Sequence, residues 1–522
     1  MVIPENFQQS PLHQREYLLN GQLRPWEGEV QEVQSPVWIE GSPFLLGSFP
    51  SMSAEHALAA VEAARAAWNQ GAGPWPTMRV AERIRCVEDF ATAMAEKREQ
   101  VARLVMWEVG KTWTDSLKEF DRTLEYIRAT IDAVKDLDRA SSRFLHEEGI
   151  LAQVRRAPLG PTLCMGPFNY PLNETYTTLI PALIMGNPVV FKPSRPGSLL
   201  HQPLLQAFRD SFPAGVVNTV YGSGARVVTP MMESGSIACL AFIGSSSAAD
   251  RLKKAHPAPH RLRCCLGLGA KNPAIILADA DLESTVKECV LGSLSFNGQR
   301  CTALKILFVH RSLAQTFVER FSQAVSALGC GMPWQQGVSI TPLPEAGKPQ
   351  EMQAYLEDAV AAGARVTNLG GGEIEGSLFR PAVLYPVAPN TRLYREEQFG
   401  PVVPIVPFDE VHEPIAYLEE SPYGQQASLF GRDPATLAAL LDRLVNQVCR
   451  VNLNSQCQRG PDTFPFTGRK DSAEGTLSVS DALRVFSVRT LIAARDSKSN
   501  KEILTEILRH RRSSFLSTDF IF

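Results

Sequence analysis

The stretch TLCMGPFNYPLNETYTTLIPALIMGNPVVFKPS, residues 162–194, contains two short apolar runs, TLCMG and PVVFK. Each run is followed by a turn or a helical pattern. Runs of the same kind recur along the chain as GVVNTVYG, IACLAFIG and NPAIIL. Upstream, helical periodicity is plain over residues 54–68, 80–110 and 113–134. Strands that alternate with helices predict a parallel sheet with crossovers, which is an α/β fold.

A second series of strands and helices begins after DADLESTVKECVLGSL, residues 279–294. It contains the strand LKILFVH, the helical patterns LAQTFVERFSQAVSAL and PQEMQAYLEDAVAAG, and the strands ARVTNL and VVPIVPF. Two such series in succession predict two α/β domains that divide near residue 278.

Composition and charge narrow the class of protein. The chain has 522 residues, 44% hydrophobic and 20% charged, with a net charge of -3. This balance gives no electrostatic reason to expect nucleic acid or an anionic membrane as a partner. We expect neither a secretory signal nor a membrane span, since no apolar run approaches the ~18 residues that a span needs. Ten cysteines without metal-ligand spacing indicate reduced thiols and a cytoplasmic location.

Cys301 is the candidate nucleophile. It lies in SFNGQRCTALKILFVHR, residues 295–311, beside Arg300 and at the start of an apolar run. Positive charge near a cysteine favours the reactive thiolate. The alternative is an inert buried cysteine, which is the commoner role of this residue type.

Five short motifs follow one another along the chain in an order and spacing that resemble the aldehyde dehydrogenase superfamily. The resemblance extends over nearly the whole sequence. A further segment, QRGPDTFPFTGRK at 458–470, is similar to the non-phosphorylating, NADP-dependent glyceraldehyde-3-phosphate dehydrogenases. The five motifs are PFNYP (167–171), FKPS (191–194), FIGSS (242–246), GQRCTA (298–303) and EEQFGPV (396–402).

The resemblance implies a domain plan. Residues 1–143 and 160–277 would form a Rossmann-like cofactor-binding domain, and residues 278–456 a catalytic α/β domain. Residues 144–159 and 486–492 would form a small β arm used to assemble a homodimer or homotetramer. The usual GxGxxG fingerprint is absent, so periodicity alone does not predict a dinucleotide site.

The resemblance also implies a reaction. In the family, a cysteine thiolate attacks the aldehyde, hydride leaves to the nicotinamide, and water hydrolyses the resulting thioester. Cys301 matches that nucleophile, and Asn169 matches the amide that, with the backbone N–H of Cys301, stabilises the oxyanion. Such donors are each worth a few kcal/mol because the charge develops only during reaction. Without the resemblance, the favoured interpretation of Asn169 is an asparagine in a turn before Pro171.

The positions matching the family's cofactor site favour NADP. Lys192 matches the cofactor lysine, although a solvated lysine at a strand end is the alternative. NAD-using members commonly carry a glutamate three residues later, where this chain has Arg195. A carboxylate would repel a 2′-phosphate, whereas Ser194, Lys192 and Arg195 together can accept one. The other matches are Ser245 for the pyrophosphate at a helix start, Glu397 for the nicotinamide ribose and Phe399 for the neighbouring wall.

The substrate positions of the glyceraldehyde-3-phosphate enzymes are matched by Arg122, Tyr170, Arg300 and Arg459. Three guanidinium groups and a phenol suit a phosphate dianion. A site for apolar aldehydes would have no reason to bury unpaired arginines. The alternative is that each arginine pairs with a carboxylate.

One departure from the family concerns the catalytic base. Where members usually read LELGGK, with a glutamate that activates water, this chain reads LGLGAK and has Gly267. A general base is typically worth ~10²–10⁴-fold in rate. Another base such as Glu396 would then act, or a thiol such as coenzyme A would accept the acyl group as in acylating semialdehyde dehydrogenases. The third alternative is an impaired family member that only binds the cofactor.

The C-terminal extension, residues 493–522, is unlike the family. Ile503, Leu504, Ile507 and Leu508 share one face of a predicted amphipathic helix. The final FLSTDFIF is apolar and strand-like, so we expect it to dock on its own or a neighbouring subunit. A frayed tail is the alternative.

Overall fold

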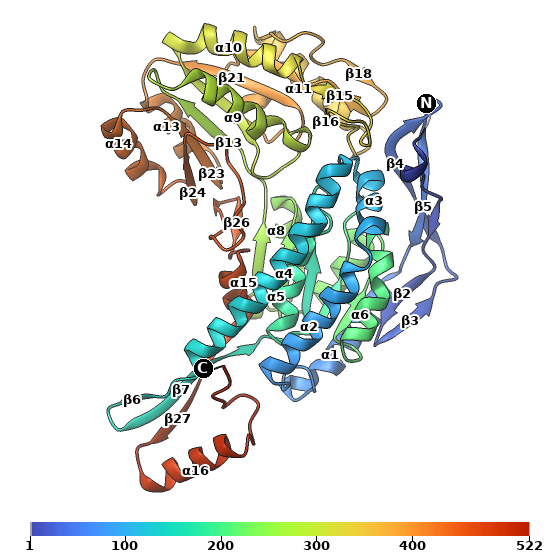
Figure 1. Ribbon diagram of the computed structural model, residues 1–522, viewed down its shortest axis with the longest axis vertical. Helices are drawn as coiled ribbons and strands as arrows, with labels where there is room; N and C mark the ends of the chain where they lie inside the picture. The colour runs from blue at the N-terminus through green and yellow to red at the C-terminus, as the bar shows by residue number, and fades with distance from the viewer. Residues whose placement is uncertain (1–2, 521–522) are drawn as a thin grey trace.

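The computed structural model describes residues 3–520, and Figure 1 shows two layered halves with an arm below them. In this range both series form mainly parallel sheets covered by helices, which confirms the α/β fold. The first series gives a six-stranded sheet whose edge strand β26 is antiparallel to β12. Its strands in spatial order are β10 (Val217–Thr219), β9 (Val189–Phe191), β8 (Thr162–Met165), β11 (Cys239–Ile243), β12 (Arg263–Gly267) and β26 (Ala473–Glu474).

The second series forms a seven-stranded sheet in the described range, parallel except at its edge strand β17. Strand β13 lies inside this sheet, between β14 and β23, although we expected residues up to 277 to belong to the first domain. The chain therefore changes sheets between β12 and β13, because NPAIIL pairs with LKILFVH. The strands in spatial order are β17 (Arg365–Val366), β20 (Ala382–Tyr385), β21 (Val402–Phe408), β14 (Leu304–His310), β13 (Asn272–Ile276), β23 (Gln426–Phe430) and β24 (Arg450–Leu453).

The helices follow the apolar periodicity of the sequence. The periodic stretch 80–110 forms two helices that meet at Glu96 and Lys97. In the first half the helices are α1 (Ala54–Trp68), α2 (Val80–Ala95), α3 (Arg98–Val109), α4 (Trp113–Ser141), α5 (Asn173–Ile184), α6 (Leu205–Ser211), α7 (Thr229–Glu233) and α8 (Ser246–Ala255). In the second half they are α9 (Leu282–Leu294), α10 (Arg311–Ser326), α11 (Lys348–Ala361), α12 (Arg392–Arg395), α13 (His412–Glu420) and α14 (Pro434–Leu444).

Further strands, outside the two large sheets, complete both halves. Five of them lie before α1, along the right-hand edge of Figure 1: β1 (Leu12–His13), β2 (Glu16–Leu19), β3 (Gln22–Pro25), β4 (Val30–Ile39) and β5 (Ser42–Pro50). The others are β15 (Gly329–Cys330), β16 (Val338–Ile340), β18 (Ile374–Glu375), β19 (Leu378–Phe379), β22 (Tyr423–Gly424) and β25 (Arg469–Lys470).

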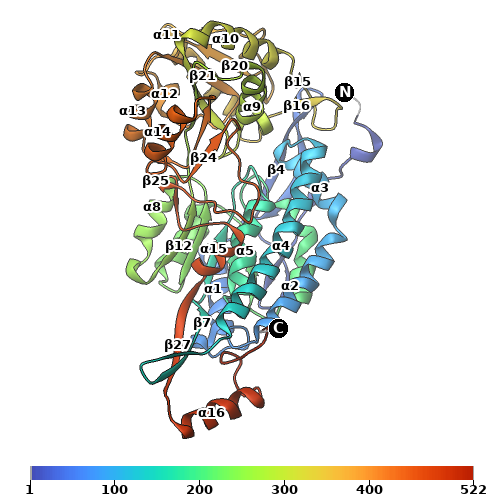
Figure 2. The ribbon, with the colours of Figure 1, turned by 60° about the vertical axis from the view of Figure 1, so that its left-hand side comes forward.

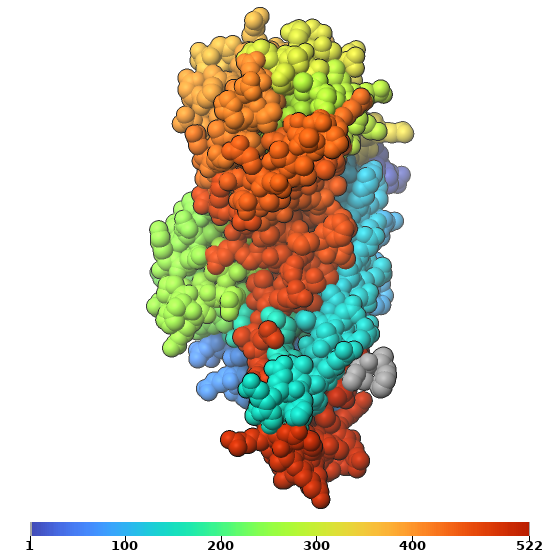
Figure 3. All heavy atoms as spheres, turned by 90° about the vertical axis from the view of Figure 1, so that its left-hand side faces the viewer, coloured from blue at the N-terminus to red at the C-terminus, as the bar shows by residue number. Residues whose placement is uncertain are grey.

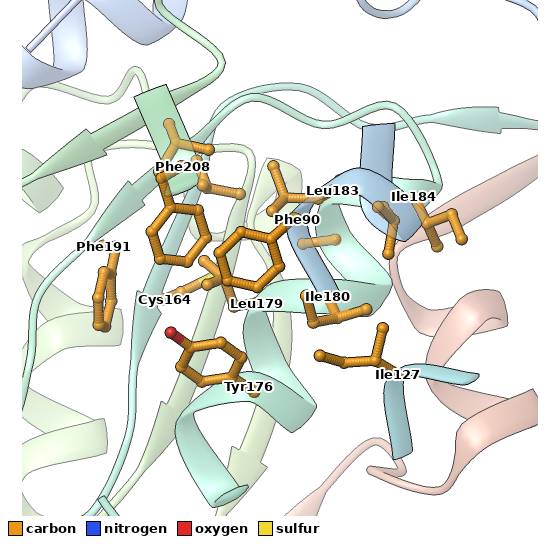
Figure 4. Close-up of a cluster of buried hydrophobic side chains, with 14 of the residues drawn as sticks. Phe90, Ile127, Cys164, Tyr176, Leu179, Ile180, Leu183, Ile184, Phe191 and Phe208 are labelled. Carbon is orange, nitrogen blue, oxygen red and sulfur yellow. The ribbon is translucent and has the colours of Figure 1, made fainter. Parts of the chain in front are cut away.

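Helix α5 lies at the centre of the first half. Every residue of α5 is buried, and the close-up in Figure 4 shows Tyr176, Leu179, Ile180 and Leu183 packed among side chains from α2, α4, β8 and α6. Burying a large apolar side chain contributes about 1.5–3 kcal/mol. This packing fixes the N-terminal end of α5, which follows the PFNYP motif.

After β24 the chain returns to the first half. Figure 3 shows this segment running down one face of the molecule, from the second half to the arm. On the way, β26 pairs with β12, and α15 (Val479–Val485) contacts α4 and α5. Residues 458–485 therefore lie between the two halves, where they can reach a site formed by both.

The arm is a three-stranded antiparallel sheet that projects from the body (Figure 2). Its strands are β6 (Leu145–Glu147), β7 (Ile150–Pro158) and β27 (Ser487–Arg495), so the two expected segments do pair. Leu145, Val488 and Leu491 on the arm are exposed. Its use in oligomerisation stays a prediction.

The C-terminal extension forms the expected helix, α16 (Lys498–Arg509), and then turns back onto its own chain. Gln153 and Arg155 of β7 donate hydrogen bonds to the Ser517 carbonyl, and Leu516 is buried. The expected docking is therefore present within one chain, although residues 513–520 form turns and not a strand. The last two residues of FLSTDFIF lie outside the described range. No helix within residues 3–520 combines the length and apolarity needed to cross a membrane.

Candidate active site

A cavity of about 740 Å³ opens between the two halves of the molecule. Its wall on one side is built from residues that follow the carboxyl ends of β8, β9, β11 and β12. Strand β8 lies between β9 and β11, so the strand order reverses at this point. Ligands of open α/β sheets bind at such a reversal. The opposite wall comes from the Cys301 loop, from residues 397–399 and from residues 458–460.

Cys301 enters this cavity from a strained turn. Three consecutive residues before it, Phe296, Asn297 and Gly298, have positive φ angles of 46°, 56° and 69°. A Cβ atom on Gly298 would lie 2.7 Å from the Ser293 carbonyl oxygen, so glycine is required here. Non-glycine residues in this region cost about 1–3 kcal/mol each and cluster at functional sites. The turn explains why GQRC has its glycine.

The thiol of Cys301 is half-buried and protonated in the absence of ligands. Burial raises its pKa to about 11, the Glu174 carboxylate adds to the rise, and Lys305 and Arg459 oppose it. We expected the positive charge of Arg300 to favour the thiolate, but Arg300 is not among the charges that lower the pKa of Cys301. Its guanidinium donates hydrogen bonds to the Leu291 and Gly292 carbonyls of α9. A proton acceptor is therefore needed before Cys301 can attack.

Asn169, the predicted oxyanion donor, lines the same cavity as Cys301. Its side chain is buried in the wall of the cavity and donates one hydrogen bond, of 2.8 Å, to the Gln299 carbonyl. The amide carries a second N–H. The backbone N–H of Cys301 makes no hydrogen bond with any residue in the described part of the chain. Both predicted oxyanion donors thus retain a free N–H near the thiol.

The predicted adenosine side of the site carries positive charge without carboxylate partners. Lys192 donates to the Pro193 carbonyl at 3.0 Å, and burial lowers its pKa to about 8. The exposed Arg195 lies against the side-chain amide of Gln31. Within residues 3–520, neither cation forms an ion pair. Ser194, between them in sequence, donates to the Pro196 carbonyl at 2.7 Å. An added phosphate group would therefore find two uncompensated cations, which suits NADP.

The predicted pyrophosphate position is a helix start. Ser245 is the N-cap of α8, and its hydroxyl accepts a hydrogen bond from the Ala248 N–H at 3.3 Å. Backbone N–H groups at such a start, together with the helix dipole, attract anions. Ser245 is exposed and lines the cavity, so an anion can reach it.

The predicted nicotinamide end also lines the cavity. Glu397 pairs with the buried Lys305, and a Cβ on Gly269 would lie 2.8 Å from its Oε2. Phe399 packs edge-on against Phe168 with ring centroids 5.8 Å apart. These contacts fix both predicted side chains.

The predicted phosphate-binding residues Arg122, Tyr170, Arg300 and Arg459 all line the cavity, but two arginines are paired. Arg122 holds Asp462 through two hydrogen bonds, of 2.9 and 2.8 Å. Arg459 is buried and pairs with both Asp462 and Glu174. The expectation of unpaired arginines is therefore wrong for Arg122 and Arg459.

Some donors of these residues stay unused. The Nη1 of Arg122, the hydroxyl of Tyr170 and the buried Nε of Arg300 have no hydrogen-bond partner among residues 3–520. Buried polar groups are rarely left unsatisfied in a folded protein. Of these donors, the Nη1 of Arg122 and the hydroxyl of Tyr170 are the ones that an anion in the cavity would meet.

The wall at Gly267 is apolar. A Cβ atom there would lie 3.3 Å from side-chain atoms of both Ile243 and Leu477, so these residues fill the space beside the missing glutamate. Glu396 is not a replacement, because it binds Arg392 and Tyr355 and does not line the cavity. The carboxylates that do line it are Glu174, Glu345 and Glu397.

Sequence reasoning missed Glu174, Asp462 and Lys305. Glu174 follows PFNYP by three residues and Asp462 lies within QRGPD, so both lie in or beside motifs that were recognised. Their roles depend on pairing with Arg459, which is 285 residues from Glu174. The sequence did contain a signal for Glu174: it is an acidic residue in the first turn of the helix that follows PFNYP.

Comparison with known proteins agrees with this geometry. Residues 28–491 match the model of the aldehyde dehydrogenase family. The chain is 33% identical over 468 residues to an NADP-dependent glyceraldehyde-3-phosphate dehydrogenase of Streptococcus equinus, covering 87% of this chain and 94% of that one. It is 30% identical to a succinate-semialdehyde dehydrogenase of Paenarthrobacter nicotinovorans, covering 87% and 100% respectively.

Among solved structures, one similar fold is the NADP-dependent glyceraldehyde-3-phosphate dehydrogenase from Bacillus halodurans C-125, complexed with NADP. The TM-score is 0.85 and the identity 31%, with 93% of this chain and 100% of that chain covered. The family match, the layered fold and the cavity around Cys301 agree: the chain belongs to the aldehyde dehydrogenase family, and is an oxidoreductase that acts on aldehydes.

Proposed function

We propose that this protein oxidises a small phosphorylated aldehyde, glyceraldehyde 3-phosphate, to 3-phosphoglycerate, with NADP as the hydride acceptor. The observation that carries the proposal is that one cavity is lined by Cys301, Asn169 and the four predicted phosphate ligands. Two of the relatives named above are NADP-dependent glyceraldehyde-3-phosphate dehydrogenases, which supports this substrate.

The cofactor assignment is supported by the charges at the adenosine side. Lys192 and Arg195 are cations without a carboxylate partner in the described range, and Ser245 presents the start of α8. Bound NADP would take up a hydride. The protein's own groups bind the phosphates, hold the aldehyde against Cys301 and stabilise the oxyanion.

The substrate assignment depends on donors that the ion pairs leave free. A phosphate dianion meets Arg122 Nη1, Arg300 and Tyr170 beside a cluster of two arginines and two carboxylates. Two charge-assisted hydrogen bonds at about 1.5 kcal/mol each correspond to about 100-fold in kcat/KM. We therefore expect glyceraldehyde 3-phosphate to exceed glyceraldehyde by about that factor.

The test is steady-state NADPH formation with NADP and glyceraldehyde 3-phosphate, glyceraldehyde or succinic semialdehyde. Arg122→Ala should raise KM for the phosphorylated aldehyde about tenfold and leave KM for glyceraldehyde nearly unchanged. A wild-type preference for either unphosphorylated aldehyde contradicts the substrate assignment.

A second candidate activity is favoured by the apolar wall at Gly267. If no group activates water, the thioester on Cys301 is transferred to a thiol such as coenzyme A. Turnover that begins only when coenzyme A is added would establish this activity. A single burst of NADPH without turnover, with or without coenzyme A, would mean that acylation occurs and release of the acyl group fails. A protein that binds NADP and forms no NADPH would be the impaired family member.

A further inference from the structure

Glu174 is one of three glutamates that line the cavity together with Cys301. Glu397 is held by Lys305 at the predicted nicotinamide end, and Glu345 lies in the segment before α11. Glu174 instead lines the cavity from the first turn of α5, on the same segment as Asn169. Glu174 and Cys301 line the same cavity, and the Glu174 charge adds to the rise that burial causes in the pKa of Cys301.

The surroundings of Glu174 hold its carboxylate in one place. Only 7% of the residue is exposed, and its partner Arg459 is 6% exposed. Arg459 is fixed in turn by Asp462, by the Leu477 carbonyl and by the Phe466 ring, which lies 4.6 Å from its guanidinium carbon. These contacts fix the carboxylate of Glu174 in the wall of the cavity that also contains Cys301.

The surroundings of Gly267 explain why the proton acceptor would lie on α5. Ile243 and Leu477 crowd the space beside Gly267, where a Cβ atom would lie 3.3 Å from side-chain atoms of both. Leu477 also supplies the carbonyl that binds Arg459. Leu477 thus crowds the space beside Gly267 and also helps to fix Arg459, the partner of Glu174.

We propose that Glu174 is the proton acceptor of this enzyme, in place of the carboxylate absent at residue 267. The proposal rests on the function proposed above. In the first step the Cys301 S–H bond breaks, the proton passes to the Glu174 carboxylate, and the sulfur forms a bond to the aldehyde carbon. Hydride then leaves that carbon with its electron pair, NADP is reduced, and a thioester remains on Cys301.

The second half of the reaction uses the same carboxylate after it has released its proton to solvent. Water forms a bond to the acyl carbon while one of its protons passes to Glu174. The C–S bond then breaks, which returns the thiolate of Cys301 and releases the carboxylic acid. Overall, one aldehyde, one water and one NADP give one acid, one NADPH and one proton.

The experiment compares Glu174→Gln with wild type in stopped-flow and steady-state NADPH assays. Glutamine keeps an oxygen that can accept from Arg459 but is a very weak base. The kcat of E174Q at neutral pH should fall by about 10²–10⁴-fold, and the acid limb of the wild-type kcat profile should disappear. The variant should still bind NADP as wild type does, because Glu174 makes no hydrogen bond or ion pair with Lys192, Ser194 or Arg195 in the described chain.

Asp462→Asn is the matched control, because Asp462 is the other carboxylate that holds Arg459 and it does not line the cavity. D462N should raise KM for the phosphorylated aldehyde and keep the acid limb of kcat. If E174Q fails to fold, Glu174→Asp serves instead: it keeps a carboxylate and should retain the acid limb with a lower kcat.

A kcat for E174Q within threefold of wild type, or an unchanged pH profile, would overturn the proposal. So would wild-type turnover that requires an added thiol. The substrate assignment has its own test and is wrong if the enzyme prefers an unphosphorylated aldehyde. In that case, comparing E174Q with wild type on the preferred aldehyde still tests the role of Glu174.

Discussion

At the scale of single residues, Lys192 has a charge that changes between pH 7 and pH 9. Its pKa is lowered to about 8 because it is buried and lies near Arg195. The lysine is therefore charged below pH 8 and neutral above it. An attraction between Lys192 and a 2′-phosphate is fully present at pH 7 and is lost as the pH rises through 8.

We predict that the Kd for NADP rises about tenfold between pH 7 and pH 9, because the charged fraction of Lys192 falls by that factor. Titration calorimetry of the wild-type protein with NADP measures it. Lys192→Arg stays charged throughout and should show a flat Kd over the same range. A flat wild-type profile would mean that Lys192 does not contact the cofactor phosphate.

Residue identities in the site were predictable, but their pairing was not. Cys301, Asn169, Ser245 and Glu397 were found because each lies in a short motif, and all four line one cavity. The Arg459–Glu174 pair joins segments far apart in sequence, and whether an arginine is paired depends on that contact. For this reason the predicted phosphate-binding residues do line one cavity, whereas the prediction that their arginines are unpaired is wrong for Arg122 and Arg459.

At the scale of elements, α5 is positioned by a buried carboxylate. Glu119 of α4 accepts hydrogen bonds from the Leu172 and Asn173 N–H groups at 3.0 and 3.1 Å, and it pairs with the buried Lys111. Lys111 also donates to the Asn169 carbonyl at 2.8 Å. One ion pair thus fixes both the start of α5 and the oxyanion donor.

Glu119→Gln should lower the free energy of unfolding by about 3–5 kcal/mol, because it leaves the Lys111 charge buried without a counter-ion. Thermal unfolding followed by circular dichroism checks it. Asp121→Asn, also on α4, removes the half-exposed partner of Arg98 and should cost less than about 1 kcal/mol. Equal losses in the two variants would contradict this account of α5.

Strands that consist of an apolar run were predictable from the sequence, including the short β8 and β9, whereas strands without such a run were not. The segments LKILFVH and VVPIVPF form β14 and β21 with the predicted bounds. The two-residue strand β26 has no periodicity to detect, yet it pairs with β12 and brings the chain back beside the cavity. The sheet to which NPAIIL belongs was also misassigned, because strand pairing depends on partners and not on the run itself.

At the scale of the whole molecule, the C-terminal extension closes onto the first half. Leu516 is 5% exposed, whereas Ile503 on α16 is 53% exposed. Arg139 and Ser142 donate further hydrogen bonds to the Phe520 and Asp519 carbonyls. The segment after α16 is thus packed, while α16 itself leaves an apolar face uncovered in the described chain.

Leu516→Asp should therefore lower the melting temperature by several degrees, because it buries an unpaired charge. Ile503→Asp places the same charge on the exposed face of α16 and should leave the melting temperature of a single chain unchanged. Differential scanning calorimetry compares the two. If L516D has the same melting temperature as wild type, the extension is a frayed tail.

Association through the arm and a cytoplasmic location stay predictions at this scale. Size-exclusion chromatography with light scattering checks the first. Removing the apolar side chains of the arm by Val488→Ser and Leu491→Ser should give a monomer. A wild-type protein that is itself monomeric would contradict the predicted dimer or tetramer.

The most direct measurement is the mass of the intact protein, quenched in acid within the first turnover with NADP and glyceraldehyde 3-phosphate. The protein should carry one added phosphoglyceroyl group, located by peptide mapping on Cys301, and Cys301→Ser should carry none and form no NADPH. NADPH production without a group on the sulfur, or undiminished production by C301S, would contradict the account.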